Sequence, residues 1–496
     1  MKRIIFSIIF FAAVFGFYSC KKQLLDINQN PNSASYSTPQ LTMPVSLERA
    51  ARYANTSYVS LGFWIGYYAT SSGFAKPVET YTYDITSSFM AAVWDNLYDN
   101  LEDIDYVEQS AKTEKLPVYE GIAKVMKAYD FQQLVDVWGK VPYSQALSGA
   151  KELAPQYDDG QEIYEDLVKK IDTAISLFKS PGAPVSINSS VDGSKILLFG
   201  DLIQSGNTDG FLTQWIKFSN TLKLKLLVQQ SQMQGRDNYI KQNLTGLTAS
   251  DFLGLGDDAL INPGYTTATA QLNPWYGFFY KSYQSSGDNY NSTVASDYAI
   301  TSYEATSDPR ISYFYTIDPS DSVYKGSVFG DPSGTPKASK IGTPSLNATG
   351  NAIIFTAAES LFLQAEAAQR GYITGDPQSL YQDAVLASFQ YTDKASAYDS
   401  YMAQPGDDVQ WDLATDKIKL IITQKWYAMN GIDVLAAYND FRRTGFPDAP
   451  LSTDVNSKGK IPVRLFYPQR ETLLNTANVL AAGNVDVFST KIFWNN

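Results

Sequence analysis

The stretch AAESLFLQAEAAQRGYITGDPQSLYQDAVLASFQY, residues 357–391, carries the pattern that decides the fold. Apolar residues recur at helical spacing over its first half, and Gly371 stands where that helix is expected to end. A second helix is predicted from about Ser379 to Tyr391, with Pro377 near its start. Two consecutive helices joined by a short turn form a helical hairpin, the unit from which tetratricopeptide-like superhelices are built.

The same pairing of helices recurs along the chain. The predicted pairs lie near residues 87–138, 161–233, 357–391 and 415–443. No strict 34-residue period is visible, so the prediction depends on pairing and not on self-similarity. We therefore expect an all-α fold, a tetratricopeptide-like superhelix of helical hairpins. Four tryptophans within the helical patterns are expected to be core anchors: Trp94, Trp138, Trp215 and Trp426.

Residues 234–350 interrupt this helical regularity. They are rich in Gly, Ser, Thr, Asn, Asp and Tyr. Loops longer than about 12–15 residues without structure of their own are uncommon in compact domains and are usually functional. We expect a large, irregular, loop-rich lobe that packs on the helices and provides the binding surface.

The first twenty residues, MKRIIFSIIFFAAVFGFYSC, have the organisation of a secretory signal. Two basic residues precede an apolar run from Ile4 to Phe15, and small Ser19 precedes Cys20, the only cysteine of the chain. The run is too short for a transmembrane helix, which takes about 20 residues. The pattern predicts a lipoprotein signal and a lipidated Cys20. The alternative is an ordinary signal that is cut elsewhere and leaves Cys20 as a free thiol.

The expected layout of the chain follows from these patterns. A signal peptide occupies residues 1–19, and a lipidated Cys20 with an extended tether occupies residues 20–45. A single domain, 46–496, contains the helical pairs and the lobe. Because two or more lipid chains hold a protein stably at a bilayer, the membrane is reached through lipid alone.

Composition excludes several classes of function. The chain has 51 acidic against 39 basic residues, a net charge of -12, which argues against nucleic acid as a partner. It has no histidine, which excludes Ser-His-Asp catalysis and His-bound zinc. A pair of carboxylates for glycoside hydrolysis and an oxygen-ligated calcium site remain open. Neither can be located, because 51 acidic residues offer too many pairs.

Six segments in the same order resemble the SusD/RagB family of Bacteroidetes outer-membrane lipoproteins, and the resemblance is closest to its starch-binding-associated branch. They are CKKQLLDINQNPN (20–32), DVWGKVPYSQAL (136–147), WIKFSNTLKLKLL (215–227), LFLQAEAAQRGY (361–372), QKWYAMNGIDVLAAYNDFRRTGFP (424–447) and PVRLFYPQRE (462–471). The resemblance implies a SusD-like nutrient-binding protein and no catalytic activity, with no cofactor and no catalytic residues. A structural calcium site is left open and unassigned.

The resemblance also implies a place and a partner. SusD-like proteins capture oligo- or polysaccharides at the cell exterior and deliver them to a SusC-like TonB-dependent transporter in the outer membrane. Some members of the family bind peptides, so the same fold with a peptide ligand is one alternative. A glycoside hydrolase that uses two carboxylates is a second.

Ligand binding is expected at aromatic side chains on loops, because a sugar ring presents an apolar C–H face to a flat π surface. Its hydroxyls then face amides and carboxylates around that surface. One candidate cluster contains Trp64, Tyr67, Tyr68 and Tyr81, and continues to Tyr83. The other contains Asn273, Trp275, Tyr276, Tyr280, Tyr283 and Tyr290, with Asp288 and Asn289 as polar partners. The alternative for each residue is that it packs the lobe onto the helices.

Overall fold

The computed structural model describes residues 37–187 and 196–495. The chain divides into two units, Met1–Thr38 and Pro39–Asn496, and the account below concerns the second. The predicted signal peptide, Cys20 and the first part of the tether lie outside the described residues. The tether prediction is wrong for residues 39–45, because helix α2 (Pro39–Thr56) already begins at Pro39. No helix in the described part of the chain is long and apolar enough to cross a membrane.

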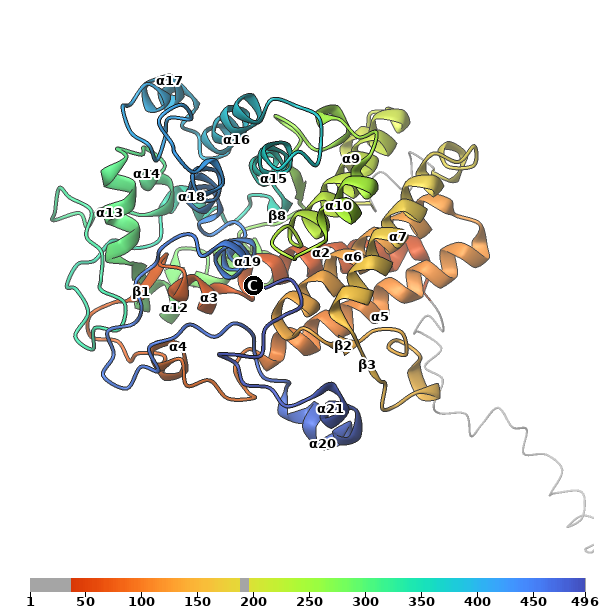
Figure 1. Ribbon diagram of the computed structural model, residues 1–496, viewed down its shortest axis with the longest axis horizontal. Helices are drawn as coiled ribbons and strands as arrows, with labels where there is room; N and C mark the ends of the chain where they lie inside the picture. The colour runs from red at the N-terminus through yellow and green to blue at the C-terminus, as the bar shows by residue number, and fades with distance from the viewer. Residues whose placement is uncertain (1–36, 188–195, 496) are drawn as a thin grey trace, which may run out of the picture. The chain divides into compact units, whose positions relative to one another are not determined.

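The helical pairs form a continuous array, which confirms the predicted all-α fold (Figure 1). The pairs are α5 (Ala91–Glu114) with α6 (Pro117–Trp138), α7 (Gly160–Phe178) with α9 (Thr208–Val228), α15 (Ala357–Gln369) with α16 (Pro377–Tyr391), and α18 (Lys417–Met429) with α19 (Val434–Thr444). Successive members pack on one another, α5 on α6, α6 on α7, α7 on α9, α9 on α15, and α15 on both α16 and α18. Helix α2 covers α5, and the shorter α8 (Gly200–Gln204) and α10 (Asp237–Leu244) pack on α9.

Local sequence explains where these helices begin and end. Asp376 caps α16 by accepting a hydrogen bond from the backbone N–H of Ser379, and Pro377 occupies the first turn, where no N–H is needed. Helix α19 ends at Gly445, whose φ of 81° is the left-handed conformation that glycine adopts most easily. The residues that start and stop these helices therefore lie directly beside them in the sequence.

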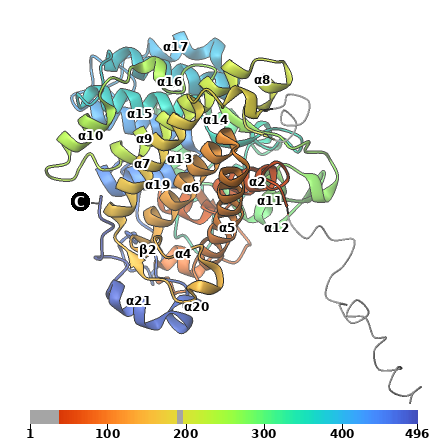
Figure 2. The same ribbon diagram turned by 90° about the vertical axis from the view of Figure 1, so that its right-hand side faces the viewer.

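The lobe is built from short elements that are held by strand pairs. Strand β1 (Tyr68–Thr70) pairs with β7 (Thr293–Ala295), and β4 (Ala259–Ile261) pairs with β8 (Ala352–Phe355), which leads into α15. Two small antiparallel pairs complete the strands: β2 (Val141–Pro142) with β3 (Tyr157–Asp158), and β5 (Tyr280–Ser282) with β6 (Ser285–Ser286). The short helices of the lobe are α11 (Pro274–Phe279), α12 (Asp288–Ser292), α13 (Asp297–Ala305) and α14 (Ile311–Phe314). Figure 2 shows α11 and α12 beside α2, and α11 packs on that helix.

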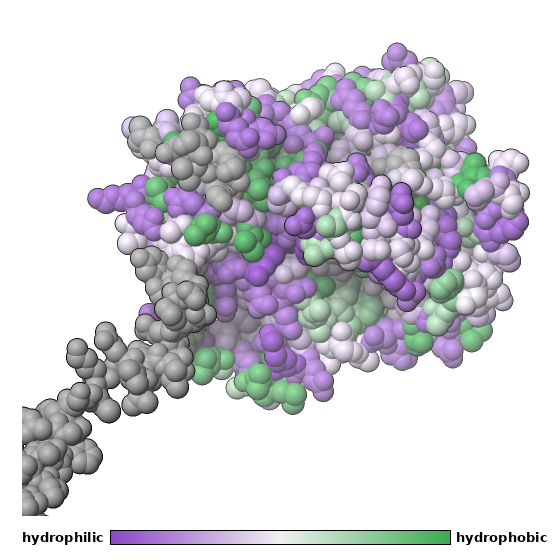
Figure 3. Space-filling view, turned by 180° about the vertical axis from the view of Figure 1, so that it is seen from behind, coloured by the Kyte–Doolittle hydropathy of each residue, from purple (hydrophilic) through white to green (hydrophobic). Residues whose placement is uncertain are grey.

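Five further α-helices of the described residues lie outside both sets: α3 (Val59–Trp64), α4 (Val78–Thr82), α17 (Tyr398–Met402), and the pair α20 (Gln469–Leu474) and α21 (Thr476–Ala482) near the C-terminus. Seen from behind, the surface mixes hydrophilic and hydrophobic residues, and the hydrophobic ones form separate groups and not one continuous patch (Figure 3).

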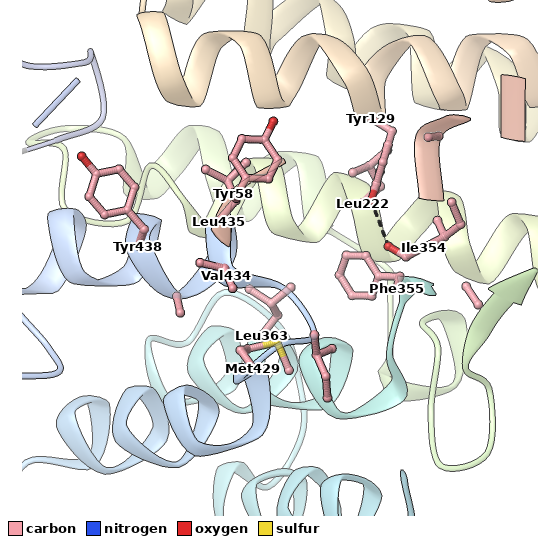
Figure 4. Close-up of a cluster of buried hydrophobic side chains, with 14 of the residues drawn as sticks. Tyr58, Tyr129, Leu222, Ile354, Phe355, Leu363, Met429, Val434, Leu435 and Tyr438 are labelled. Atoms are coloured by element: carbon pink, nitrogen blue, oxygen red, sulfur yellow. Dashed lines mark hydrogen bonds between the residues drawn. The ribbon is translucent and has the colours of Figure 1, made fainter. Parts of the chain in front are cut away.

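One hydrophobic core runs through the array and under the lobe. The four tryptophans expected to be core anchors are at most 2% exposed, which confirms that prediction. Burying a large apolar side chain contributes roughly 1.5–3 kcal/mol. Figure 4 shows where the array meets the lobe: the Tyr129 hydroxyl of α6 donates to the Ile354 carbonyl of β8 at 3.1 Å. This bond and the packing of Phe355 beside Leu222 of α9 fix strand β8 on the helices.

Candidate ligand-binding site

The structure places the first predicted cluster inside the core. The side chains that are at most 1% exposed are Trp64, Tyr67, Tyr68, Tyr81 and Tyr83. The Trp64 indole donates to the Thr80 carbonyl at 2.9 Å, and the Tyr67 hydroxyl donates to the Trp426 carbonyl at 2.6 Å. Because these rings are covered and their polar atoms are bonded, Trp64, Tyr67, Tyr81 and Tyr83 cannot form a sugar surface. Their assignment to binding is corrected to packing of α3, α4 and β1; Tyr68 differs and is taken up below.

The second predicted cluster is brought together on the surface. We call the residues Tyr276, Tyr280, Tyr283 and Tyr290 the tyrosine row. The rings of Tyr276 and Tyr280 are stacked, with centroids 4.5 Å apart and planes at 16°. Tyr290 lies 5.0 Å from Tyr280, and Tyr283 lies 6.3 Å from Tyr276. Helix α11, the β5–β6 hairpin and helix α12 thus bring four tyrosines of a loop-rich segment into one aromatic row.

Local contacts explain the geometry of the tyrosine row. Asn273 caps α11 by accepting from the Tyr276 N–H at 3.1 Å, and Pro274 starts the helix. The Tyr276 hydroxyl accepts from the Gln284 N–H at 2.9 Å and so fixes the hairpin turn. Gln284 has a φ of 61°, which is costly for a residue with a side chain. The turn is therefore held by the tyrosine that it covers.

The row is open to solvent at one end. Tyr283 is 46% exposed, Tyr280 and Tyr290 are half-buried, and Tyr276 is buried. Burial and the neighbouring Tyr290 raise the pKa of Tyr280, which keeps its hydroxyl neutral. A hollow of about 400 Å³ lies beside the row, between α2 and α11, and its walls include Arg52, Phe278 and Tyr280.

The two predicted polar partners differ in their bonding. Asp288 lies 3.4 Å from Lys281 in an ion pair whose side chains are 86% and 64% exposed. Asn289 donates to the Phe278 carbonyl at 2.9 Å and remains exposed. Both therefore sit at the rim of the tyrosine row, where a ligand with hydroxyl groups would meet them.

A second hollow lies on the other side of Asn273. We call this cavity of about 250 Å³ the asparagine cavity, after Asn55, Asn273, Asn347, Asn351 and Asn430, which line it. Its aromatic walls are Tyr68, Trp275, Tyr313, Phe314 and Tyr391. Asn273 lines both hollows, so the asparagine cavity and the tyrosine row adjoin across the start of α11.

Hydrogen bonds fix the amide walls of the asparagine cavity. Asn273 donates to the carbonyls of Gly350 and Asn351 at 3.1 and 3.0 Å. Asn55 donates to the Ile353 carbonyl at 2.8 Å and accepts from the Ile353 N–H at 3.2 Å. These bonds join α2, the start of α11, strand β8 and the residues just before that strand.

The sequence interpretation found some members of this cavity and missed others. Tyr68, Asn273 and Trp275 were predicted to bind ligand, and they do meet at one cavity. Asn55, Tyr313, Tyr391 and Asn430 were missed. Asn55 lies near the end of α2 and Asn430 directly follows α18, and no local pattern marks either residue as part of a cavity.

No Asp or Glu lines either hollow in the described part of the chain, although Arg52 and Lys281 line the hollow beside the tyrosine row. None of the described residues that line the asparagine cavity is Asp or Glu, so it lacks the carboxylate pair that glycoside hydrolysis requires. Within residues 37–187 and 196–495, no group of three or more His, Cys, Asp or Glu side chains could hold a metal ion.

These features define a tetratricopeptide-like, all-α fold of helical hairpins that carries an irregular lobe with an aromatic surface and an uncharged cavity. The family is SusD-like: the family model described as "Starch-binding associating with outer membrane" matches residues 29–468, and the chain belongs to that family. The predicted family is thus confirmed. No curated protein matches the chain.

Solved structures show the same fold. A chitin-binding SusD homolog from Flavobacterium johnsoniae has a TM-score of 0.73 at 21% identity, covering 92% of this chain and 98% of that one. A SusD-like protein from Bacteroides thetaiotaomicron reaches 0.75 at 21% identity over the same shares. A SusD homolog from Parabacteroides distasonis reaches 0.75 at 18% identity, covering 93% of this chain and 98% of that one.

Proposed function

We propose that this protein is a cell-surface lipoprotein that captures an oligo- or polysaccharide and delivers it to a SusC-like TonB-dependent transporter. The observation that carries the proposal is the tyrosine row, an aromatic surface open at Tyr283 and flanked by a hollow. The family description supports a carbohydrate ligand and an outer-membrane location. The chitin-binding homolog with the same fold points to the same class of ligand.

The tyrosine row suits a glycan for physical reasons. Tyrosine rings present an apolar face to the C–H side of a sugar and lose little conformational freedom on binding, because they have only two side-chain torsions. Asp288 and Asn289 at the rim offer an acceptor and an amide to the sugar hydroxyls. The hollow between α2 and α11 extends the surface, so that several rings of one chain could be held together.

The anchor and the partner belong to the same proposal. Lipidation at Cys20 would hold the protein at the outer membrane, facing the cell exterior, with no membrane-spanning helix required. Mild detergent extraction followed by co-purification should recover a large β-barrel transporter with the protein. Repeated isolation without such a protein would argue for a lipoprotein that acts alone.

Calorimetry against a panel of polysaccharides, oligosaccharides and peptides tests the ligand class. Saccharide binding without the appearance of cleavage products is the expected outcome, because neither hollow supplies a carboxylate pair. Cleavage of a saccharide would show that the protein is a glycoside hydrolase and contradict the proposal of capture alone. Binding of peptides but not saccharides would show that the ligand of this fold is a peptide.

A further inference from the structure

A third hollow, of about 380 Å³, adjoins the hollow beside the tyrosine row. We call it the lysine hollow, because Lys76 is the one charged residue among the described residues that line it. Thr56 and Phe278 line both hollows, and Asn289 at the rim of the tyrosine row also lines the lysine hollow. A saccharide held on the tyrosine row therefore lies next to the lysine hollow.

Lys76 has no carboxylate partner in the described part of the chain. Its ammonium group donates to the carbonyls of Thr70 at 3.4 Å and Ser71 at 3.2 Å, and Thr70 itself lines the lysine hollow. An ammonium group has three N–H donors, so one of them remains for a ligand. Burial lowers the pKa of Lys76, and the charge of Asp331 opposes that shift only in part.

The two carbonyls that Lys76 contacts do not depend on it. The Thr70 carbonyl also accepts from the Ser327 hydroxyl at 3.3 Å. The Ser71 carbonyl also accepts from the Phe74 N–H at 3.4 Å. Because each carbonyl keeps a second donor, the lysine is not required to satisfy either of them. A half-buried cation without a counter-charge costs free energy, and perturbed groups of this kind are concentrated at functional sites.

A second lysine without a carboxylate partner among the described residues lies at the same serine. Lys340 donates to the Ser71 hydroxyl at 3.4 Å and to the Asn291 carbonyl. Burial lowers the pKa of Lys340 as well. Asn291 directly follows Tyr290 of the tyrosine row. Two ammonium groups thus meet at Ser71, next to the segment that contributes Tyr290 to the row.

The charged residues that line the hollow beside the tyrosine row are also cations, Arg52 and Lys281. Arg52, which is 46% exposed, pairs with Glu48, and Lys281 forms the exposed pair with Asp288. Exposed pairs contribute only about 0–1 kcal/mol, so a ligand anion can compete for these cations. The net charge of -12 opposes an anion, but distant charges are screened beyond about 8 Å at physiological ionic strength. The nearby cations therefore decide which ligand is favoured.

We propose that the lysine hollow binds an anionic substituent, a carboxylate or a sulfate ester, of the captured saccharide. Lys76 donates a charge-assisted hydrogen bond to that substituent, Lys340 adds a second positive charge at Ser71, and the tyrosine row holds the sugar rings. This inference rests on the proposed glycan capture and names its substrate class, an acidic saccharide. The two substituents share one chemistry here, because lysine binds an anion as a point charge.

Saccharide pairs that differ in charge test the proposal by calorimetry with the full chain at about 0.15 M salt. The β-1,4-linked tetramer of glucuronic acid should bind roughly tenfold tighter than the β-1,4-linked tetramer of glucose. The α-1,4-linked tetramer of galacturonic acid should likewise bind more tightly than its methyl ester. A third pair, lactose with and without one sulfate ester on its galactose ring, tests sulfate as the source of the charge.

The pairs also identify the anion. A preference in the first two pairs assigns the site to a carboxylate, and a preference in the third pair alone assigns it to a sulfate ester. Raising the salt concentration to about 1 M should remove most of the preference, because charges are then screened within about 3 Å.

A variant then assigns the preference to Lys76. Lys76→Met should weaken binding of the preferred acidic saccharide by roughly tenfold and leave its neutral counterpart within about twofold. Its Tm should stay close to that of the natural protein, because the Thr70 and Ser71 carbonyls keep their other donors. Lys76→Arg keeps the positive charge and should keep the preference.

The matched control is Lys241→Met on α10, which removes the same charge from the helical array and should change neither affinity. If Lys76→Met does not fold, Lys340→Met removes the second charge at Ser71 and should lower the same preference.

The outcomes separate this inference from the proposed function. Equal affinity within all three saccharide pairs, or binding confined to neutral saccharides, would overturn the anionic site and leave glycan capture standing. Equal weakening of an acidic saccharide and its neutral counterpart by Lys76→Met, together with a lower Tm, would show a structural role and overturn the assignment. Binding of peptides but of no saccharide would overturn both proposals.

Discussion

The helical array and the asparagine cavity differ in the kind of polar side chain that they bury. In the array, the Arg443 guanidinium lies 2.8 Å from both Glu366 and Asp440, and Lys425 lies 3.0 Å from Asp440. The asparagine cavity is lined by uncharged side chains, and Asn273 there donates to the carbonyls of Gly350 and Asn351. Buried charges of the array therefore pair with one another, whereas the walls of the cavity are neutral and are held by amide–backbone hydrogen bonds.

The largest expected effect comes from breaking the charged network of the array. Arg443→Ala leaves Glu366 and Asp440 buried without their main cation, and should lower the free energy of unfolding by about 3–5 kcal/mol. Urea unfolding followed by circular dichroism measures the change.

The control for Arg443→Ala is Lys458→Ala. Lys458 pairs with Asp84 at 3.2 Å, but the two side chains are 47% and 67% exposed. Its removal should change stability by less than about 0.5 kcal/mol. If both variants behaved alike, the charges of the array would not be the stabilising elements that the comparison assigns to them.

The next expected effect is a change in the pH dependence of the free energy of unfolding. It concerns a buried polar group of the array that is not fully hydrogen-bonded. Asp130 on α6 is fully buried and accepts from the Asn100 amide at 2.8 Å, while one oxygen of each side chain lacks a partner. Burial raises the pKa of Asp130 from 3.8 to about 7. The folded protein therefore keeps a proton that the unfolded chain releases above about pH 4, and this group lowers stability as the pH rises to about 7.

Asp130→Asn removes that penalty and supplies a permanent N–H donor for the free oxygen of Asn100. The variant should be more stable than the natural protein by about 2–4 kcal/mol at pH 8 and should show little difference at pH 4. Urea unfolding at the two pH values measures both numbers. A loss of stability of equal size at pH 4 and pH 8 would contradict the raised pKa and point to a packing defect.

The array could be predicted from the sequence because its signals are local. Asp376, Pro377 and Gly371 stand beside the helices that they start or stop, and the helical spacing of apolar residues lies within one segment. Helix α2 was missed: it lies before the predicted helical pairs, and its first residues were assigned to an extended tether. The prediction is correct where the residues that start a helix, stop it and form its apolar face all lie within one short segment.

The lobe could be predicted only in part, because its geometry depends on contacts between distant segments. Strand β1 has three residues and meets β7 by pairing Tyr68 with Ala295, far along the chain. Tyr67 and Tyr68 are neighbours of the same type, yet Tyr67 bonds to Trp426 in the core and Tyr68 lines the cavity. Residue type alone cannot separate these roles, since tyrosine suits both a covered and an open surface.

The smallest expected effect on stability comes from Tyr283→Ala. This variant tests whether the tyrosine row of the lobe contributes to glycan binding. Tyr283 is 46% exposed, so its removal should change the free energy of unfolding by at most about 0.5 kcal/mol. Aromatic contacts contribute about 0.5–1.5 kcal/mol, so affinity for the captured glycan should fall roughly 2- to 10-fold. Calorimetry and urea unfolding of the same preparation give both values.

The matched control is Tyr106→Ala on α5, a tyrosine that is 37% exposed and belongs to the array. It should leave glycan affinity unchanged, because Tyr106 lies on α5 and is not part of the tyrosine row. If Tyr283→Ala also left affinity unchanged, the tyrosine row would be packing for the β5–β6 hairpin. Ligand binding would then have to be sought in the asparagine cavity, whose lining residues are all uncharged.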